Sequence, residues 1–317
     1  MSHAGDLRYH LDMLDDATEI EKLNERLAID GAARFEQGEG KLTKLVLTAP
    51  AGEAHVYRYG AHVTHYQPRG QRPVLFVSER ASFTRGRPIR GGVPIIFPWF
   101  GMRASDPQSP LHGLARLAEW DVDSVTSRGE TVTAVLSLKS TDEMTATWPH
   151  EFRLQHIVTI GPELDLTLNV TNETGEPCTF EQAMHTYFAV ADVRRISVSG
   201  LSGTAYLDKN RNMEKFLDSD DPLVLTEPAD RVYLGTRGKC IINDPAGGRR
   251  IIVDKEGSDA TVVWNPWENP AKPIADLAAD EWLKFICVET CNVKDYAVTL
   301  VGEATHTMRT IIRSEML

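Results

Sequence analysis

The chain has 317 residues, of which 42% are apolar, so it can bury a full hydrophobic core in one or two domains. Its 34 basic and 45 acidic residues give a net charge of −11, which argues against general nucleic-acid binding and against binding to anionic membranes. No apolar run is long enough to cross a bilayer, so we expect neither a nucleic acid nor a membrane as a partner.

The number of cysteines and the start of the chain favour a reducing, cytoplasmic location. The first residues have neither the basic cluster nor the apolar core of a signal peptide, and four cysteines are too few for a disulfide scaffold. Cys287 and Cys291 are the closest pair, but in a strand they would lie about 13 Å apart, too far for one disulfide. We therefore expect a cytoplasmic protein with reduced, buried thiols.

Residues 1–34 differ in pattern from the rest of the chain. Ile20, Leu23 and Leu27 recur at helical spacing in an acidic stretch, which predicts one amphipathic helix packed on the main domain. We expect two parts, a helical extension over residues 1–34 and a single β-sandwich domain over residues 35–317.

After Lys41 the apolar period changes from helical spacing to two. Leu164 to Val170 alternates with polar residues, which predicts a half-buried strand, and Gly161-Pro162 before it predicts a hairpin turn. Further strands are predicted at 42–48, 55–66, 74–77, 131–139, 152–160, 178–190, 195–199, 239–243, 249–254, 260–264, 283–293 and 308–313. This regular spacing predicts a mainly β fold, a large antiparallel β-sandwich.

One segment is strongly basic. Between residues 80 and 116 the only acid is Asp106, against six arginines. Because guanidinium groups bind phosphate oxygens in a two-pronged geometry, the patch favours a site for a small anion. Composition alone leaves open a solvated loop with scattered ion pairs. The arginines are Arg80, Arg85, Arg87, Arg90, Arg103 and Arg116.

The same segment has the composition of a pocket wall. Gly91 and Gly92 permit close backbone approach, and the prolines and aromatic residues up to Gly101 make the following stretch stiff and bulky. The alternative is a rigid loop of the core.

Five motifs follow one another along the chain: Arg90-Gly-Gly-Val-Pro with Phe97-Pro-Trp-Phe-Gly101, His112-Gly-Leu-Ala-Arg116, His185-Thr-Tyr-Phe188 with Asp192-Val, Val263-Trp-Asn-Pro-Trp267, and Cys287-Val-Glu289 with Asn292-Val. Together and in this order they resemble the signature of the glucose-6-phosphate 1-epimerases, or hexose-6-phosphate mutarotases, of the aldose 1-epimerase group. The resemblance covers about Leu42 to Arg313.

The resemblance implies a galactose mutarotase-like sandwich with the sugar bound on one concave sheet. It implies that His185 and Glu289 are the catalytic acid and base, and that Arg90 and Arg116 hold the substrate, with the phosphate a target. Asp208, in the short motif Tyr206-Leu-Asp208-Lys, matches a substrate-contacting acid. Leu111 departs from the pattern, because some members of the family have glutamine at this position.

His112 and Trp267 complete the expected substrate-binding set. Trp264 and Trp267 are residues that could stack on an apolar sugar face or simply fill the core. A lone histidine in an apolar strand, such as His185, is usually a core residue, whereas a carboxylate such as Glu289 in an apolar run is costly to bury unpaired.

The chemistry of anomer exchange fits such a pair. Ring opening removes a proton from the C1 hydroxyl and gives one to the ring oxygen O5, which needs a base and an acid but no metal or cofactor. We expect Glu289 to take the C1 proton and His185 to protonate O5, with the roles exchanged on closure.

Two other functions stay open. One is an aldose 1-epimerase acting on free hexoses, and the other is a non-catalytic sugar-phosphate binding protein on the same fold. We expect a monomer with a sugar phosphate as its partner. His55, His62 and His65 invite a metal interpretation, but residues 62 and 65 point to opposite faces of a regular strand, so no metal site is expected.

Overall fold

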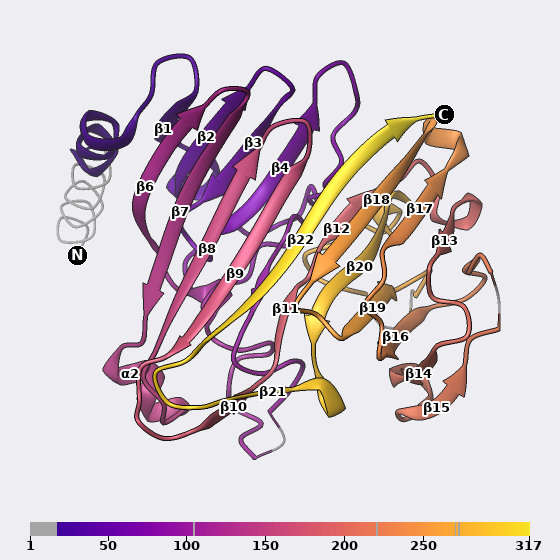
Figure 1. Cartoon of the computed structure of the whole chain (residues 1–317). Helices are drawn as coiled ribbons and strands as arrows, with labels where there is room; N and C mark the ends of the chain where they lie inside the picture. The colour runs from indigo at the N-terminus through magenta and orange to yellow at the C-terminus, as the bar shows by residue number, and fades with distance from the viewer. Residues whose placement is uncertain (1–17, 104, 220, 270, 272) are drawn as a thin grey trace, which may run out of the picture.

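The computed structural model describes residues 18–317 except 104, 220, 270 and 272 (Figure 1). Residues 18–27 are helical, while the first residues of the predicted helix and of the N-terminal extension lie outside the described part. Leu23 is buried in the main core, and Ile20 and Leu27 pack against that core. The apolar side of the helix therefore covers the β-sheets, as its spacing predicts.

The large sheet, which contains the longest strand of the fold, is antiparallel and has eight strands. Its strands alternate in burial, since Leu164, Leu166, Leu168 and Val170 face the core while the residues between them are partly exposed. Their order is β13 (Ser197–Ser199), β17 (Cys240–Asp244), β18 (Arg249–Glu256), β22 (Thr305–Met316), β9 (Leu164–Asn172), β8 (Phe152–Ile160), β7 (Thr131–Lys139) and β6 (Asp121–Arg128).

A second sheet of four strands packs against one half of the first. Its strands are β1 (Ala33–Gln37), β2 (Thr43–Ala49), β3 (Gly52–Tyr57) and β4 (His62–Pro68), paired in that order. Strand β1 runs across the boundary that the sequence predicts at residue 34, because its backbone pairs with β2 from Ala33 onward.

A third sheet covers the other half and carries most of the motifs. Its strands are β15 (Glu214–Leu217), β14 (Ala205–Asp208), β16 (Ala229–Leu234), β19 (Ala260–Asn265), β20 (Phe285–Asn292), β11 (Gln182–Met184) and β5 (Ile95–Ile96), with β12 (Tyr187–Ala189) also paired to β20. Figure 1 shows this sheet behind the β17–β18–β22 side of the large sheet.

The hydrophobic core lies between the large sheet and the two sheets that cover it. Strand β20 is buried along its whole length because it has a packed surface on each side. Ile286 and Val288 point into the main core, whereas Cys291 packs in a second cluster on the opposite face. Glu289 shares this opposite face, since side chains alternate along a strand.

Smaller elements complete the fold. Strands β10 (Cys178–Phe180) and β21 (Val298–Leu300) form a two-stranded sheet, and the helix α2 (Asp142–Thr147) links β7 to β8. Short 3-10 turns lie at Glu39–Lys41, Ala115–Leu117, Val193–Arg195, Lys209–Arg211, Pro245–Gly247, Glu281–Lys284 and Lys294–Tyr296.

Two of the predicted strands are interrupted, and the predicted strand at 74–77 forms isolated bridges at Leu75 and Val77 instead. The stretch 55–66 contains a turn between β3 and β4, where Gly60 and Ala61 have positive φ angles of 76° and 45°. The stretch 178–190 is divided into β10, β11 and β12. The prediction was wrong there because apolar residues lie close on both sides of each break, so the residue pattern does not mark the breaks.

The two glycines of the first motif are required by close packing. Gly91 has a φ of 115°, and a Cβ there would lie 2.4 Å from the carbonyl oxygen of Phe76. Gly92 has a φ of 62°, and a Cβ there would lie 2.4 Å from the carbonyl oxygen of Val63. Neither position tolerates a side chain, which confirms the close backbone approach expected of this pair.

The four cysteines are free and buried. Cys287 and Cys291 lie in the same strand, as the spacing predicts. In the described part of the chain, no helix has the length and apolar character needed to span a bilayer.

Candidate active site

A cavity of about 530 Å³ opens on the face of the third sheet that points away from the main core. Motif residues from distant parts of the sequence meet here. The side chains around it come from Arg90, Phe100, Gly101, Met102, Leu111, His112, His185, Lys209, Asp230, Trp264, Ile274 and Glu289. The cavity is of a size that suits a small molecule.

Strand register brings His185 and Glu289 together. Gln182 pairs with Asn292 in β11, and Tyr187 pairs with Cys287 in β12. The same register continues through both strands and places His185 opposite Glu289. The ladder is broken at this point, because the backbone N–H of His185 donates to the carbonyl oxygen of Pro94 instead.

The two side chains meet without forming a hydrogen bond. His185 Nδ1 lies 3.4 Å from Glu289 Oε1. Within the described residues, this nitrogen and both carboxyl oxygens of Glu289 are buried and have no hydrogen-bond partner. Burial raises the pKa of Glu289 well above its usual range and lowers the pKa of His185 well below its own. Burial therefore favours the neutral forms of both groups.

A second buried acid, Glu281, shows how unusual the unpaired carboxyl group of Glu289 is. Glu281 is as buried as Glu289, at 1% exposure for each. Glu281 accepts hydrogen bonds from the Ser78 hydroxyl at 2.6 Å and from the backbone N–H groups of Glu79 and Ala278 at 2.8 Å each. A buried polar group without partners requires an explanation, and a bound polar ligand supplies one for Glu289.

His112 presents a fixed donor to the cavity. Its Nδ1 accepts the backbone N–H of Gly101 at 3.1 Å, which leaves the proton of the neutral ring on Nε2. Burial, together with the charges of Arg116, Lys209 and Arg90, lowers the pKa of His112 to about 2. The ring is thus neutral at physiological pH, and it lies edge-on to His185 with centroids 5.7 Å apart.

Arg90 lines the cavity and is held on two sides. Its Nε donates to Asp276 Oδ1 at 3.1 Å, and one terminal nitrogen donates to the Tyr187 hydroxyl at 2.9 Å. Tyr187 in turn stacks on His185, with centroids 4.9 Å apart and ring planes 9° from parallel. These contacts fix the guanidinium group beside the histidine.

Arg116 does not line the cavity. It is buried and donates to the carbonyl oxygen of Leu111 at 2.6 Å, so it braces the loop that carries Leu111 and His112. Its charge nevertheless acts on the site, since it helps to lower the pKa values of His112 and His185.

The rest of the arginine patch disperses over the structure. Arg80, Arg85 and Arg87 are exposed, and Arg103 lies over the ring of Trp99. The six arginines are close in sequence but do not form one cluster in the structure, and Arg90 is the member of the patch that lines the cavity.

Lys209 and Asp230 are cavity residues that the sequence did not single out. Lys209 directly follows β14, and its Nζ lies 3.0 Å from Asp230 Oδ2 on β16. Asp230 faces Trp264 across β16 and β19. Lys209 could have been found from the sequence, because it immediately follows the predicted Asp208. Asp230 could not, because its place in the cavity depends on the pairing of β16 with β19.

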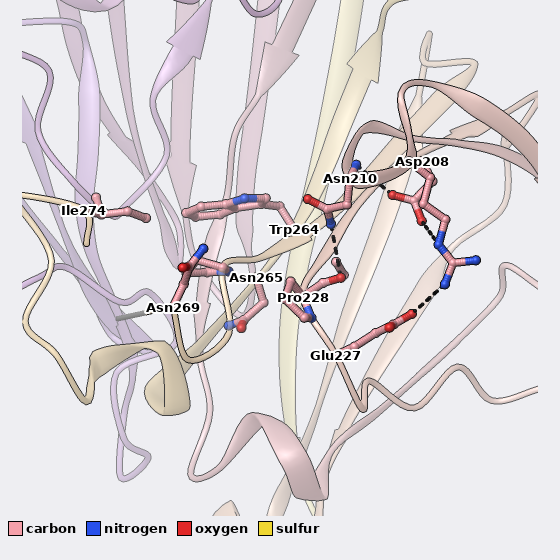
Figure 2. Close-up of a pocket in the computed structure, with 11 residues that line it drawn as sticks. Asp208, Asn210, Glu227, Pro228, Trp264, Asn265, Asn269 and Ile274 are labelled. Carbon is pink, nitrogen blue, oxygen red and sulfur yellow. Dashed lines mark hydrogen bonds and ion pairs between the residues drawn. The ribbon is translucent and has the colours of Figure 1, made fainter. Parts of the chain in front are cut away.

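Asp208 lies in a neighbouring pocket of about 460 Å³ that shares Trp264 and Ile274 with the cavity (Figure 2). Its Oδ1 accepts the backbone N–H of Asn210 at 2.9 Å. Figure 2 shows Asp208 and Asn210 on one side of Trp264 and Ile274 on the other. Asp208 therefore lines this neighbouring pocket and not the cavity that His185 and Glu289 line.

Trp267 also lies outside the cavity. It lines a hollow of about 180 Å³ and packs on Trp282, with ring centroids 4.9 Å apart. Its positive φ of 58° turns the chain away from the sheet after β19. Of the two tryptophans considered from the sequence, Trp264 is the one that reaches the cavity.

Known proteins were compared with the chain and its fold. A family model described as aldose 1-epimerase matches residues 43–313. A protein of Cenchrus ciliaris provisionally named glucose-6-phosphate 1-epimerase is 34% identical over 259 residues, which span 79% of this chain and 78% of that protein. A protein of Escherichia coli strain K12 with the same provisional name is 32% identical, over 86% of this chain and 90% of its own.

A solved structure supports the same grouping. A protein of Salmonella typhimurium that is provisionally described as a mutarotase superimposes with a TM-score of 0.85 and 27% sequence identity. The superposition covers 92% of this chain and 96% of that one. The extended sandwich, including the sheet that bears the cavity, is therefore a mutarotase fold.

Proposed function

Because the chain belongs to the aldose 1-epimerase family, a family of isomerases, we propose that it interconverts the α and β anomers of an aldohexose 6-phosphate, preferably glucose 6-phosphate. The observation that carries the proposal is the pair His185 and Glu289, buried in one cavity with polar atoms that lack partners among the described residues. The names of the two relatives from Cenchrus ciliaris and Escherichia coli support the phosphate ester as substrate.

The reaction breaks and reforms one bond of the sugar. Loss of the C1 hydroxyl proton and protonation of O5 break the C1–O5 bond and leave an aldehyde. Rotation about C1–C2 presents the other face of the carbonyl, and O5 then attacks C1. The proton returns from O5 to the base while the new hydroxyl at C1 takes one from the acid, so atoms and charge balance over the cycle.

His185 and Glu289 together hold one transferable proton. Burial of the pair favours the place of this proton on Glu289. When sugar hydroxyls donate to the carboxyl oxygens, the charged carboxylate becomes less costly and the proton moves the 3.4 Å to His185 Nδ1. Glu289 is then the base toward the C1 hydroxyl, and the Nε2–H of the imidazolium is the acid toward O5.

The phosphate would meet the cations of the cavity wall. Arg90 and Lys209 are the two basic residues among the described lining residues. Arg90 is paired with Asp276 and Lys209 with Asp230, so the ester would share these two cations with the two carboxylates. Arg116 supports this wall from behind through Leu111.

The primary test follows the anomers directly. Freshly dissolved α-glucose 6-phosphate is mixed with the protein and an excess of a dehydrogenase specific for the β anomer. We expect the protein to accelerate β formation well above the spontaneous rate. Free α-glucose, followed by polarimetry, is the comparison substrate, and we expect little acceleration with it because it lacks the phosphate that would contact Arg90 and Lys209.

One observation favours a second candidate, an epimerase for free hexoses. Arg90 is already paired with Asp276, and Lys209 with Asp230, so neither cation depends on a phosphate for a partner. Acceleration with free glucose alone would establish this alternative. No acceleration with either sugar would favour a sugar-phosphate binding protein without catalysis.

The proposal places the enzyme in the cytoplasm. Four free, buried cysteines suit a reducing compartment. The expected substrate is also an intracellular class of metabolite, because its charged phosphate prevents passive escape through a membrane.

A further inference from the structure

Two histidines and an acid that the catalytic cavity does not use lie together on the four-stranded sheet. Glu53 and His55 alternate with buried residues in β3, so both point to the partly exposed face of that sheet. His65 lies on the neighbouring strand β4 and is also partly exposed. We propose that Glu53, His55 and His65 form a binding site for a divalent transition-metal ion, with Zn²⁺ as the ion to test.

Strand register creates the cluster. His55 pairs directly with His65 across β3 and β4. Glu53 precedes His55 by two residues and therefore shares its face. Each of the three residues offers a ligand atom, and these atoms lie within 4.8 Å of one another. Within the part of the chain that the structure describes, this is the one group of three histidine, cysteine or acidic side chains whose ligand atoms lie that close together.

The side chains are already arranged near one another. The imidazole rings of His55 and His65 are stacked with centroids 4.6 Å apart, and His55 Nε2 lies 2.9 Å from Glu53 Oε1. An ion between them would replace this single contact with three bonds. Small rotations of the side chains are enough, because bound ligand atoms of Zn²⁺ lie about 2.0–2.2 Å from the metal.

The chemistry of the set suits such an ion. Two imidazoles and one carboxylate are a known ligand combination for Zn²⁺, and histidine is largely neutral at physiological pH. Imidazole ligands select transition metals over Mg²⁺ and Ca²⁺, which prefer oxygen. Three protein ligands leave room for water, and Glu53 also borders a surface hollow of about 280 Å³ from which solvent can enter.

The opposing charge nearby is already compensated. Lys44 lies on the adjacent strand β2, where its Nζ is 2.9 Å from Glu36. Thr48 approaches the second oxygen of Glu53 at 3.5 Å, which leaves the carboxylate turned along the sheet toward His55.

The third histidine of the sequence pattern has another role. His62 is buried, and its Nε2 contacts the carbonyl oxygen of Gly91 at 2.7 Å. The expectation that His62 and His65 diverge therefore holds, but it did not exclude the pair His55 and His65. That pair depends on the register of β3 with β4, which includes an irregularity after His55.

A metal bound here would act on stability. It would join β3 to β4 in the native state only, so it would stabilise folding according to its affinity and concentration. The inference does not depend on the proposed function, because none of the three residues lines the catalytic cavity.

The test uses the full chain freed of metal by a chelator and then titrated with Zn²⁺ in a calorimeter. We expect one ion per chain and a higher Tm at saturating Zn²⁺. His65→Asn and His55→Asn should each weaken binding at least tenfold and abolish the Tm shift. Glu53→Gln keeps the shape of the side chain and should weaken binding less, which gives a variant that folds if a histidine variant does not.

Two controls locate the site. His150→Asn removes a histidine from outside the cluster and should leave binding unchanged. A variant with both His3 and His10 replaced by Asn tests histidines that lie outside the described residues, and it should also bind normally. The proposal is overturned if wild type binds no Zn²⁺, or if His55→Asn and His65→Asn bind it as wild type does.

Discussion

Two buried glutamates of this protein have the same exposure and opposite surroundings. Glu281 is satisfied by one hydroxyl and two backbone donors. Glu289 has no hydrogen-bond donor among the described residues and lies against His185. Glu281 therefore stabilises the fold, whereas Glu289 destabilises it, because an unpaired buried carboxyl group retains its full desolvation cost.

Replacement of each glutamate by glutamine should therefore have opposite effects on stability. Glu281→Gln keeps one acceptor oxygen for three donors and should lower the free energy of unfolding by about 2–4 kcal/mol. Glu289→Gln should raise it by about 1 kcal/mol while reducing anomerase turnover by about 10²–10⁴. Urea unfolding and the coupled assay measure the two quantities. A less stable Glu289→Gln protein with normal turnover would contradict both expectations.

The stabilisation by Glu289→Gln should depend on pH. The native state raises the pKa of Glu289, so above the unfolded pKa of about 4.3 the native protein retains a proton that the unfolded chain has lost. The contribution of this group to stability is then complete at low pH and falls as pH rises. We expect the Tm difference between variant and wild type to grow from pH 4 toward pH 8. A constant difference would mean that Glu289 has an ordinary pKa.

Lys209 tests the contact with phosphate. Lys209→Met removes the charge and keeps the length of the side chain, so we expect KM for glucose 6-phosphate to rise about tenfold or more, the loss of one charge-assisted hydrogen bond. The kcat should change less, because Lys209 is not placed at the reacting atoms. Lys215→Met, an exposed position on β15, is the matched control. Equal KM values for both variants would remove Lys209 from the phosphate site.

At the scale of elements, the motifs are brought together by close backbone contacts at glycines and by breaks within strands. The sequence predicted β7 and β8 at their observed bounds, because both alternate regularly between apolar and polar residues. It did not predict β5, which is buried but has only two residues, nor β6, β14 and β15, which are in part exposed and lack a clear apolar period. It also missed the breaks at Gly60 and at His185, where apolar residues lie close on both sides of the irregularity.

Gly91 provides a test of the close backbone approach. Gly91→Ala should destabilise the protein by about 3 kcal/mol or more, since the added Cβ would lie 2.4 Å from a backbone oxygen and the φ of 115° is unfavourable for alanine. Gly129→Ala is the control, because its φ is also positive but no atom lies within 4 Å of its added Cβ. It should cost about 1–2 kcal/mol. Equal losses in urea unfolding would show that φ alone governs both positions.

At the scale of the whole molecule, the sequence identified the sandwich and most of the cavity for different reasons. Periodicity alone predicted the sandwich, while the motifs proposed His185, Glu289, Arg90 and His112, which the structure brings into one cavity. Arg116, Asp208 and Trp267 carry motif positions but lie outside it. Their placement depends on the direction of the chain after each strand, and a linear pattern does not contain that direction.

The packing of the three sheets also predicts how the thiols react. The four cysteines are buried, and burial raises the pKa of each, to about 11 for Cys240. We expect a thiol reagent to modify none of them rapidly in the native protein and all four in denaturant, with the number of labels counted by mass spectrometry. Rapid labelling without denaturant would indicate local opening of the sandwich.

The register that aligns His185 with Glu289 also limits which changes of chain length this protein can accept during evolution. An inserted residue between Gln182 and His185 would turn the imidazole to the opposite face of the sheet or move it past the carboxyl group. The same insertion in the exposed turn from β6 to β7, at Gly129 and Glu130, would alter only a surface loop. Proteins of this fold should therefore vary in length at that connection, while the number of residues from Gln182 to His185 stays constant.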